Sequence, residues 1–115
     1  EGVLNYGKPH PRGYGTFSRV IRKYVNETSI LSIEEAIYKM TGFPAQTLGL
    51  KDRGILKEGF FADITIFDQE TIAEQATFTS PHNYSTGIKH VLVNGKLTIN
   101  DGKHESVTNG AILKK

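Results

Sequence analysis

The first half of the chain carries its apolar residues at helical spacing. From Gly15 onward, five apolar side chains recur three or four residues apart, as they do along one face of a helix, and basic side chains occupy the opposite face. The apolar positions are Phe17, Val20, Ile21, Tyr24 and Val25. The pattern predicts an amphipathic helix that begins near Gly15.

Two further helices are indicated by start and stop signals. Ser32 followed by Glu35 has the spacing of a capping box, in which each side chain accepts a hydrogen bond from the other residue's backbone. An apolar stripe follows, and Thr41-Gly42 ends it. Pro44 is predicted to open a short third helix, which closes at Gly49.

The second half changes to short β patterns. Residues 60–67 are β-branched and aromatic, and residues 88–93 form a second such run. Asn94-Gly95 then predicts a type I′ hairpin turn, because both positions of that turn need positive φ. Residues 96–99 are the predicted returning strand, and Asn100-Asp101-Gly102 is a further predicted turn. Residues 111–113 are predicted as a last short strand, and 68–87 as irregular.

These patterns divide the chain into two zones. The predicted division is 1–50, a loop with two or three helices, and 51–115, a mostly antiparallel β subdomain. Residues 1–14 are rich in glycine and proline and are predicted to be irregular. Three or four short strands offer little surface for the apolar helix faces. We therefore expect this surface to be covered by further sequence or by self-association.

Composition narrows the possible functions. The net charge is +2 and the 14 Lys and Arg are scattered, which argues against nucleic-acid binding. No apolar run approaches the roughly 20 residues that span a bilayer, and no signal peptide is apparent. The chain has no cysteine, which excludes disulfides and thiolate chemistry and is compatible with the expected cytoplasmic location. Its opening at Glu1-Gly2, without Met, suggests a piece of a longer protein.

The four histidines do not form a metal motif. None pairs with another at the i, i+2 or i, i+4 spacing that directs two imidazoles to one ion, so we expect no metal site made by this chain alone. His10 lies between Pro9 and Pro11, which restrict the backbone and precede Arg12. A stiffened segment that presents an arginine can clamp a carboxylate with two hydrogen bonds, and a structural salt bridge is the alternative role for Arg12.

Several segments together resemble a known family. They are His10-Pro11-Arg12-Gly13-Tyr14-Gly15-Thr16-Phe17-Ser18-Arg19-Val20, residues 31–41 (LSIEEAIYKMT), residues 52–68 (DRGILKEGFFADITIFD), Ala76-Thr77-Phe78, Pro81-His82, Gly87-Ile88 and residues 91–96 (VLVNGK). The pattern G-x-x-x-x-G-x-x-A-D-I is similar to the metal-dependent amidohydrolase superfamily as a whole. The pattern H-P-R-x-Y-G-T-F resembles its N-acyl-D-amino-acid deacylase (D-aminoacylase) branch.

The resemblance implies a fold class and a cofactor. Such enzymes have a (β/α)8 barrel with zinc and a small β-sandwich built from both chain termini. This chain is then an α+β fragment: the last loop and helices of the barrel, followed by the C-terminal part of the sandwich. The metal-binding cysteine and histidines of the family lie upstream. Zinc is therefore expected in the full-length parent and not in this chain.

The resemblance also implies a reaction and site residues. The expected reaction is hydrolysis of the amide bond of N-acyl-D-amino acids, and the isolated chain is expected to be inactive. Glu1, followed by Gly2, aligns with the general-base Asp of the family's Ser-Asp-Gly motif and is longer by one methylene. Arg12 aligns with a residue that binds the substrate α-carboxylate, and His10 is a second candidate for substrate binding.

Two other functions remain open from the sequence. The first is another amidohydrolase specificity, hydantoinase-like or dipeptidase-like, against which the H-P-R segment argues. The second is a non-catalytic homologue that acts as a binding or structural module, which the change from Asp to Glu1 allows.

Overall fold

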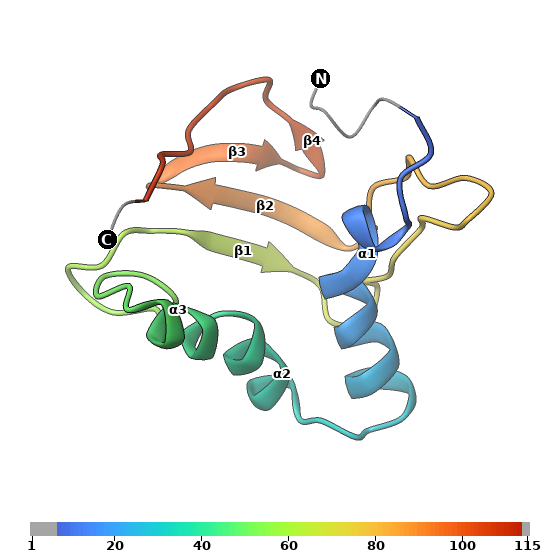
Figure 1. Cartoon of the computed structure of the whole chain (residues 1–115), viewed down its shortest axis with the longest axis horizontal. Helices are drawn as coiled ribbons and strands as arrows, with labels where there is room; N and C mark the ends of the chain where they lie inside the picture. Colours follow the sequence, from blue (N-terminus) through green and yellow to red (C-terminus); the bar gives the residue numbers. More distant parts are fainter. Residues whose placement is uncertain (1–6, 114–115) are drawn as a thin grey trace.

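The computed structural model describes residues 7–113 and divides them into a helical part and a sheet (Figure 1). In chain order the helices are α1 (Arg12–Arg19), η2 (Val20–Glu27), α2 (Ile33–Met40) and α3 (Gly42–Leu48), and the strands are β1 (Ile64–Phe67), β2 (Ile88–Val93), β3 (Lys96–Asn100) and β4 (Lys103–His104). The expectation of an α+β chain, helices first and antiparallel strands after, is confirmed.

The first helix begins earlier than the sequence pattern predicts. Arg12, Gly13 and Tyr14 are helical, so the prediction of an irregular segment through residue 14 is wrong for these three. Pro11 has φ −52° and ψ −25°, and its carbonyl accepts hydrogen bonds from the Tyr14 and Gly15 amides. A proline is well suited to this position, because its locked φ is already helical and a missing N–H costs nothing at a helix start.

Helix α1 continues directly into η2, and together they form one helical rod, residues 12–27. The second part of this rod, η2, is a π-helix rather than the regular α-helix that the apolar spacing predicts. At the end of η2, the Thr28 amide donates to the Lys23 carbonyl, five residues back, over 3.0 Å. The apolar stripe still faces inward in part, since Ile21 and Val25 are buried, whereas Phe17 keeps 65% of its surface exposed.

The start of α2 follows the sequence prediction closely. The Glu35 amide donates to the Ser32 hydroxyl over 3.1 Å, and the Ser32 amide donates to the Glu35 carboxylate over 2.9 Å. Both members of the capping box are therefore made. α3 ends at Gly49, whose φ of 72° closes the helix in the left-handed conformation, also as predicted.

The four strands form one antiparallel sheet in the order β1-β2-β3-β4. Asn94 and Gly95 join β2 to β3 with φ values of 52° and 75°, as a type I′ turn requires. The prediction of a strand at 111–113 is wrong. β4 already pairs with the edge of β3, and the returning segment is held instead by the Asn109 side chain, which donates to the Leu97 carbonyl and the Thr98 hydroxyl.

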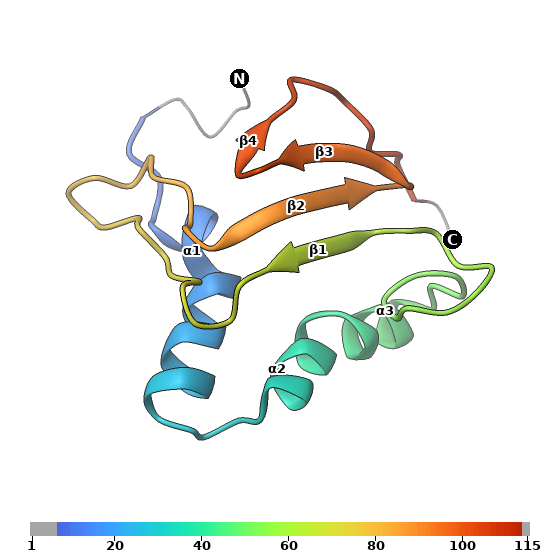
Figure 2. The ribbon, with the colours of Figure 1, turned by 180° about the vertical axis from the view of Figure 1, so that it is seen from behind.

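The core is small within residues 7–113. The buried apolar residues are Ile21, Val25, Ala36, Ala45, Ile72 and Ala76, and no large side chain is fully buried. Ile64 and Ile66 of β1 and Val91 and Val93 of β2 are all at least partly exposed, and so are Phe60 and Phe61, which precede β1. In Figures 1 and 2, α2 and α3 lie beyond the β1 edge and α1 lies at the end of β1 and β2, so these helices do not cover the face of the sheet, which explains this exposure.

The irregular segment between β1 and β2 packs against the helical zone. Within it, Ala73 and Thr86 form one isolated β-bridge, and Ile72 and Ala76 enter the core. It runs so close to α1 that a Cβ at Gly15 would lie 2.6 Å from the Cβ of Glu74. Contacts therefore cross between the two zones, and the division at residue 50 stays a prediction. No helix among residues 7–113 combines the length and apolar character needed to cross a membrane.

Candidate functional site

A groove of about 610 Å³ runs between the start of the helical rod and residues 74–78. His10, Pro11 and Arg12 line it from one side, and Glu74 and Phe78 line it from the other. Figures 1 and 2 agree that the irregular loop from which residues 74–78 come lies beside α1. The structure therefore brings two of the sequence-predicted site residues, His10 and Arg12, to one concave surface.

Arg12 is the first residue of α1 and is exposed. Its backbone amide donates to Nδ1 of His10 over 3.1 Å, and this contact ties the two candidate residues together. Among residues 7–113, no side chain pairs with the Arg12 guanidinium, so the alternative of a structural salt bridge is not made there. The His10 ring packs edge-on against Phe78 at 4.9 Å between centroids.

The other charges beside the groove are paired. Glu74 accepts hydrogen bonds from Arg19 at 2.8 Å and from Arg22 at 2.8 and 2.5 Å, and Arg22 also pairs with Glu27. The Glu74 side chain is 12% exposed. The hydrogen bond from Arg22 lowers the pKa of Glu74 to about 2, although burial acts in the opposite direction. The same contact raises the pKa of Arg22.

Glu74 is the residue of this site that the sequence pattern did not reveal. It lies in the segment predicted to be irregular, 55 and 52 residues from its two arginine partners. No local spacing signals a contact over such a distance. The two arginines themselves appear in sequence only as the polar face of a helix.

The other site predictions lie elsewhere or find no support in geometry. Glu1, the predicted general base, lies outside the described residues. Within residues 7–113, nowhere do three or more His, Cys, Asp or Glu side chains gather to hold a metal ion. The described side chains therefore do not fit a zinc site by themselves.

Comparison with known proteins places the chain in a family. A sequence model of the amidohydrolase family matches residues 5–99. The chain belongs to the amidohydrolase family.

Within that family, the similarity is to deacylases of N-acyl-D-amino acids. The chain is 47% identical over 95 residues to N-acyl-D-glutamate deacylase and 43% identical over 95 residues to D-aminoacylase, both of Alcaligenes xylosoxydans xylosoxydans. Each alignment covers 83% of this chain and 20% of the relative, so the chain spans about a fifth of the length of these proteins. The resemblance indicated by the H-P-R segment is confirmed.

Solved structures agree with the sequence comparison. A D-aminoacylase crystal structure superposes with a TM-score of 0.90 at 38% identity over 94% of this chain and 23% of that one. N-acyl-D-glutamate deacylase from Bordetella bronchiseptica, complexed with zinc and a phosphonate inhibitor that mimics the tetrahedral intermediate, superposes at 0.78 with 39% identity. It covers 90% of this chain and 23% of that one. The chain therefore has the fold of one part of a D-aminoacylase.

Proposed function

We propose that this chain is part of a zinc-dependent amidohydrolase that hydrolyses the amide bond of N-acyl-D-amino acids. Two relatives that align with 83% of this chain are an N-acyl-D-glutamate deacylase and a D-aminoacylase, and one structural neighbour is a zinc complex. In this proposal residues 1–50 form the end of the barrel and 51–115 belong to the small β subdomain. The zinc ligands lie in other parts of the enzyme, so the isolated chain is inactive. A cytoplasmic location stays a prediction.

The observation that best supports this proposal is that the Arg12 guanidinium forms no ion pair within residues 7–113. Three arginines lie on one helical rod, and Glu74 pairs with Arg19 and Arg22 but not with Arg12. Within the described part of the chain, Arg12 thus presents an unpaired charge among the residues that line the groove. A guanidinium in this state can bind a carboxylate through two parallel hydrogen bonds. We assign it to the α-carboxylate of the substrate.

The carboxylate clamp and a proton acceptor would act together. Holding the anionic end of the substrate fixes where its amide lies, and orientation of this kind is a large part of catalysis. Glu1 is proposed as the group that accepts a proton from the attacking water and returns it to the leaving amine. Its extra methylene shifts the carboxylate relative to an Asp, which would lower the rate rather than abolish it.

The Arg12→Gln variant of the complete enzyme tests the clamp. We expect kcat/KM for an N-acyl-D-amino acid to fall on the order of 100-fold, because the substrate carboxylate loses a charged partner. The matching carboxamide substrate, which has no carboxylate, should be turned over by both proteins at similar rates.

Arg19→Gln is the matched control, since Arg19 lines the same groove but already pairs with Glu74. We expect it to lose less than about tenfold on either substrate. An equal loss on both substrates for Arg12→Gln, or no loss, would contradict the clamp.

A different specificity has one observation in its favour. The chain is 41% identical over 58 residues to the dihydroorotase of Endomicrobium trichonymphae, which covers 50% of this chain and 14% of that one. This match is shorter than those to the deacylases, and the dihydroorotase of Lactobacillus acidophilus, which aligns over 97 residues, is only 33% identical. A panel of hydantoins, dihydroorotate and N-acyl-D-amino acids decides between them: turnover of the cyclic amides alone would overturn our choice.

A non-catalytic role is tested by restoring the family residue. If the complete protein is inactive and Glu1→Asp yields no zinc-dependent hydrolysis, the protein is a binding or structural homologue. Zinc-dependent hydrolysis by either the Glu1 protein or the Glu1→Asp variant supports the proposed enzymatic function.

A further inference from the structure

The loop between β1 and β2 is bonded to the chain on both sides of Arg12. Nε2 of His82 lies 2.8 Å from the carbonyl oxygen of Gly7, and Nδ1 of the same ring lies 3.0 Å from the hydroxyl of Tyr14. These partners are 75 and 68 residues away in sequence. One side chain thus joins the segment before helix α1 to the first turn of that helix.

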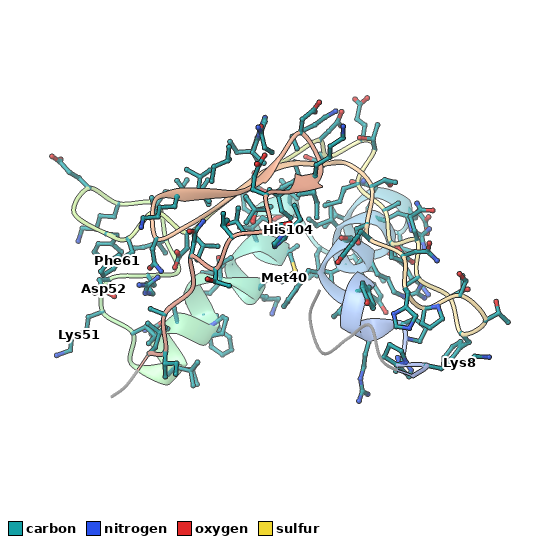
Figure 3. The ribbon with its side chains drawn as sticks, turned by 90° about the horizontal axis from the view of Figure 1, so that it is seen from above. Lys8, Met40, Lys51, Asp52, Phe61 and His104 are labelled. Carbon is teal, nitrogen blue, oxygen red and sulfur yellow. The ribbon has the colours of Figure 1, made fainter. Side chains whose placement is uncertain are left out.

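Neighbouring residues of the loop reinforce this arrangement. The Ser85 hydroxyl donates to the Tyr14 carbonyl over 3.3 Å, and the Tyr84 ring packs against Tyr14 at 5.5 Å between centroids. Lys8, next to Gly7, marks the place in Figure 3, at the opposite end of the molecule from Lys51, Asp52 and Phe61. The contacts form a local clasp around the start of α1.

The hydrogen-bond chemistry assigns the tautomer of His82. A carbonyl oxygen can only accept, so Nε2 must carry the proton and donate to Gly7. In the neutral ring Nδ1 is then an acceptor, and the Tyr14 hydroxyl donates to it. Both ring nitrogens are used, one toward each side of Arg12.

This arrangement has a consequence for the groove. Arg12 carries a long side chain at the first position of α1, and helix ends fray more readily than helix interiors. Its amide already holds His10, and His10 packs on Phe78 from the same loop. A shift of about 1 Å in a substrate-binding group is enough to cost large factors in rate. A fixed backbone on both sides of Arg12 prevents such a shift.

We propose that His82 is a positioning residue, which acts with Tyr14 to hold the backbone that presents Arg12 to the substrate carboxylate. This inference rests on the proposed function. It assigns a role in recognition of the carboxylate to His82, which is not among the residues that line the groove.

The test uses the complete enzyme with three variants at the clasp. His82→Phe removes both hydrogen bonds, and Tyr14→Phe removes one. His82→Gln retains a donor and an acceptor that flank a single carbon, as the two ring nitrogens do. For an N-acyl-D-amino acid we expect His82→Phe to raise KM about tenfold with little change in kcat, and Tyr14→Phe to give part of that effect. His82→Gln should restore most of the loss.

Two further readouts separate positioning from general stability. The carboxamide substrate should be turned over normally by His82→Phe. In combination with Arg12→Gln, His82→Phe should add no further loss, because the group that it positions is gone. His104→Phe is the matched control. His104 lies on β4, away from Lys8 in Figure 3, and its Nδ1 accepts only from the nearby Ser106 amide among the described contacts.

The outcomes distinguish the two proposals. Equal losses on both substrates, additive losses with Arg12→Gln, or no rescue by His82→Gln would overturn the role of His82 and leave the clamp intact. If Arg12→Gln itself has no effect on the carboxylate substrate, the clamp fails and the role of His82 fails with it. Should His82→Phe not fold, Tyr14→Phe and His82→Gln supply the same comparison.

Discussion

The charged side chains along the groove differ in whether they form ion pairs. Glu74 is largely buried and binds Arg22 through both carboxylate oxygens, with Arg19 as a second partner. The two arginines are 32% and 48% exposed, so solvent screens part of the interaction. We therefore regard Glu74 as the residue that orients this end of the rod, and Arg12 as the charge left for a ligand.

The pKa of Glu74 leads to a prediction about stability and pH. Its value of about 2 lies below the ordinary 4.5, so between these values the unfolded chain binds more protons than the folded one. The stabilisation is complete above about pH 4.5 and is lost as the pH falls toward 2. We expect Glu74→Gln to reduce the free energy of unfolding by roughly 1–3 kcal/mol at neutral pH. Near pH 2, where Glu74 becomes protonated, the reduction should be much smaller.

Denaturant unfolding of the complete enzyme across this pH range measures the effect. Glu70→Gln is the control, because Glu70 is an exposed carboxylate of the same segment that makes no ion pair within the described residues. The account of Glu74 fails if the two variants lose the same stability at every pH.

At the scale of elements, short-range hydrogen bonds decide where helices and turns begin and end. The capping box of α2 and the left-handed Gly49 are each made by residues a few positions apart. The Asn94-Gly95 turn is also local, with positive φ at both positions. The exception is η2, where the apolar spacing predicts a helix but does not reveal its π-helical bonding.

The capping box provides a test at this scale. Ser32→Ala removes the side-chain acceptor of the Glu35 amide and should destabilise α2 by about 1 kcal/mol. Amide hydrogen exchange should then be about fivefold faster in α2 and unchanged in the sheet. Glu34→Gln, next to the box but not part of it, should leave exchange of the Glu35 amide slow. Uniform acceleration in both variants would contradict a specific cap.

The molecule as a whole exposes more surface than its mass requires. Its accessible area is 8607 Å², whereas a compact monomer of 12.7 kDa exposes about 6,200 Å². The radius of gyration is 14.8 Å, against about 13 Å for a compact chain of this length. Leu56, Phe78 and Ile112 are 80%, 77% and 90% exposed. Much of the apolar surface is thus available to pack against further sequence.

This exposure predicts how the isolated 115-residue chain behaves. We expect it to self-associate with rising concentration and to bind a hydrophobic dye, because apolar surface of this extent is unfavourable in water. Sedimentation velocity and dye fluorescence measure both properties. Leu56→Gln should weaken the association, while Lys57→Gln, a neighbouring polar change, should not. A monodisperse monomer that binds no dye would show that the exposed surface needs no partner.

The sequence by itself determined the local features and the family. Helical spacing, the Ser32–Glu35 box and the Asn94-Gly95 turn depend on interactions between residues a few positions apart. The sequence pattern is therefore enough to predict them. The segment from His10 to Val20 likewise indicated the deacylase resemblance and the pair His10 and Arg12.

Only the tertiary structure decided which charges are paired and what the irregular loop does. The contacts of Glu74 with Arg22 and of His82 with Gly7 join residues 52 and 75 positions apart. No periodicity records such contacts, because they depend on how the chain folds back on itself. The exposure of the strand residues also depends on the tertiary structure, because the helices do not cover the sheet, whereas the early start of α1 follows from the local backbone at Pro11.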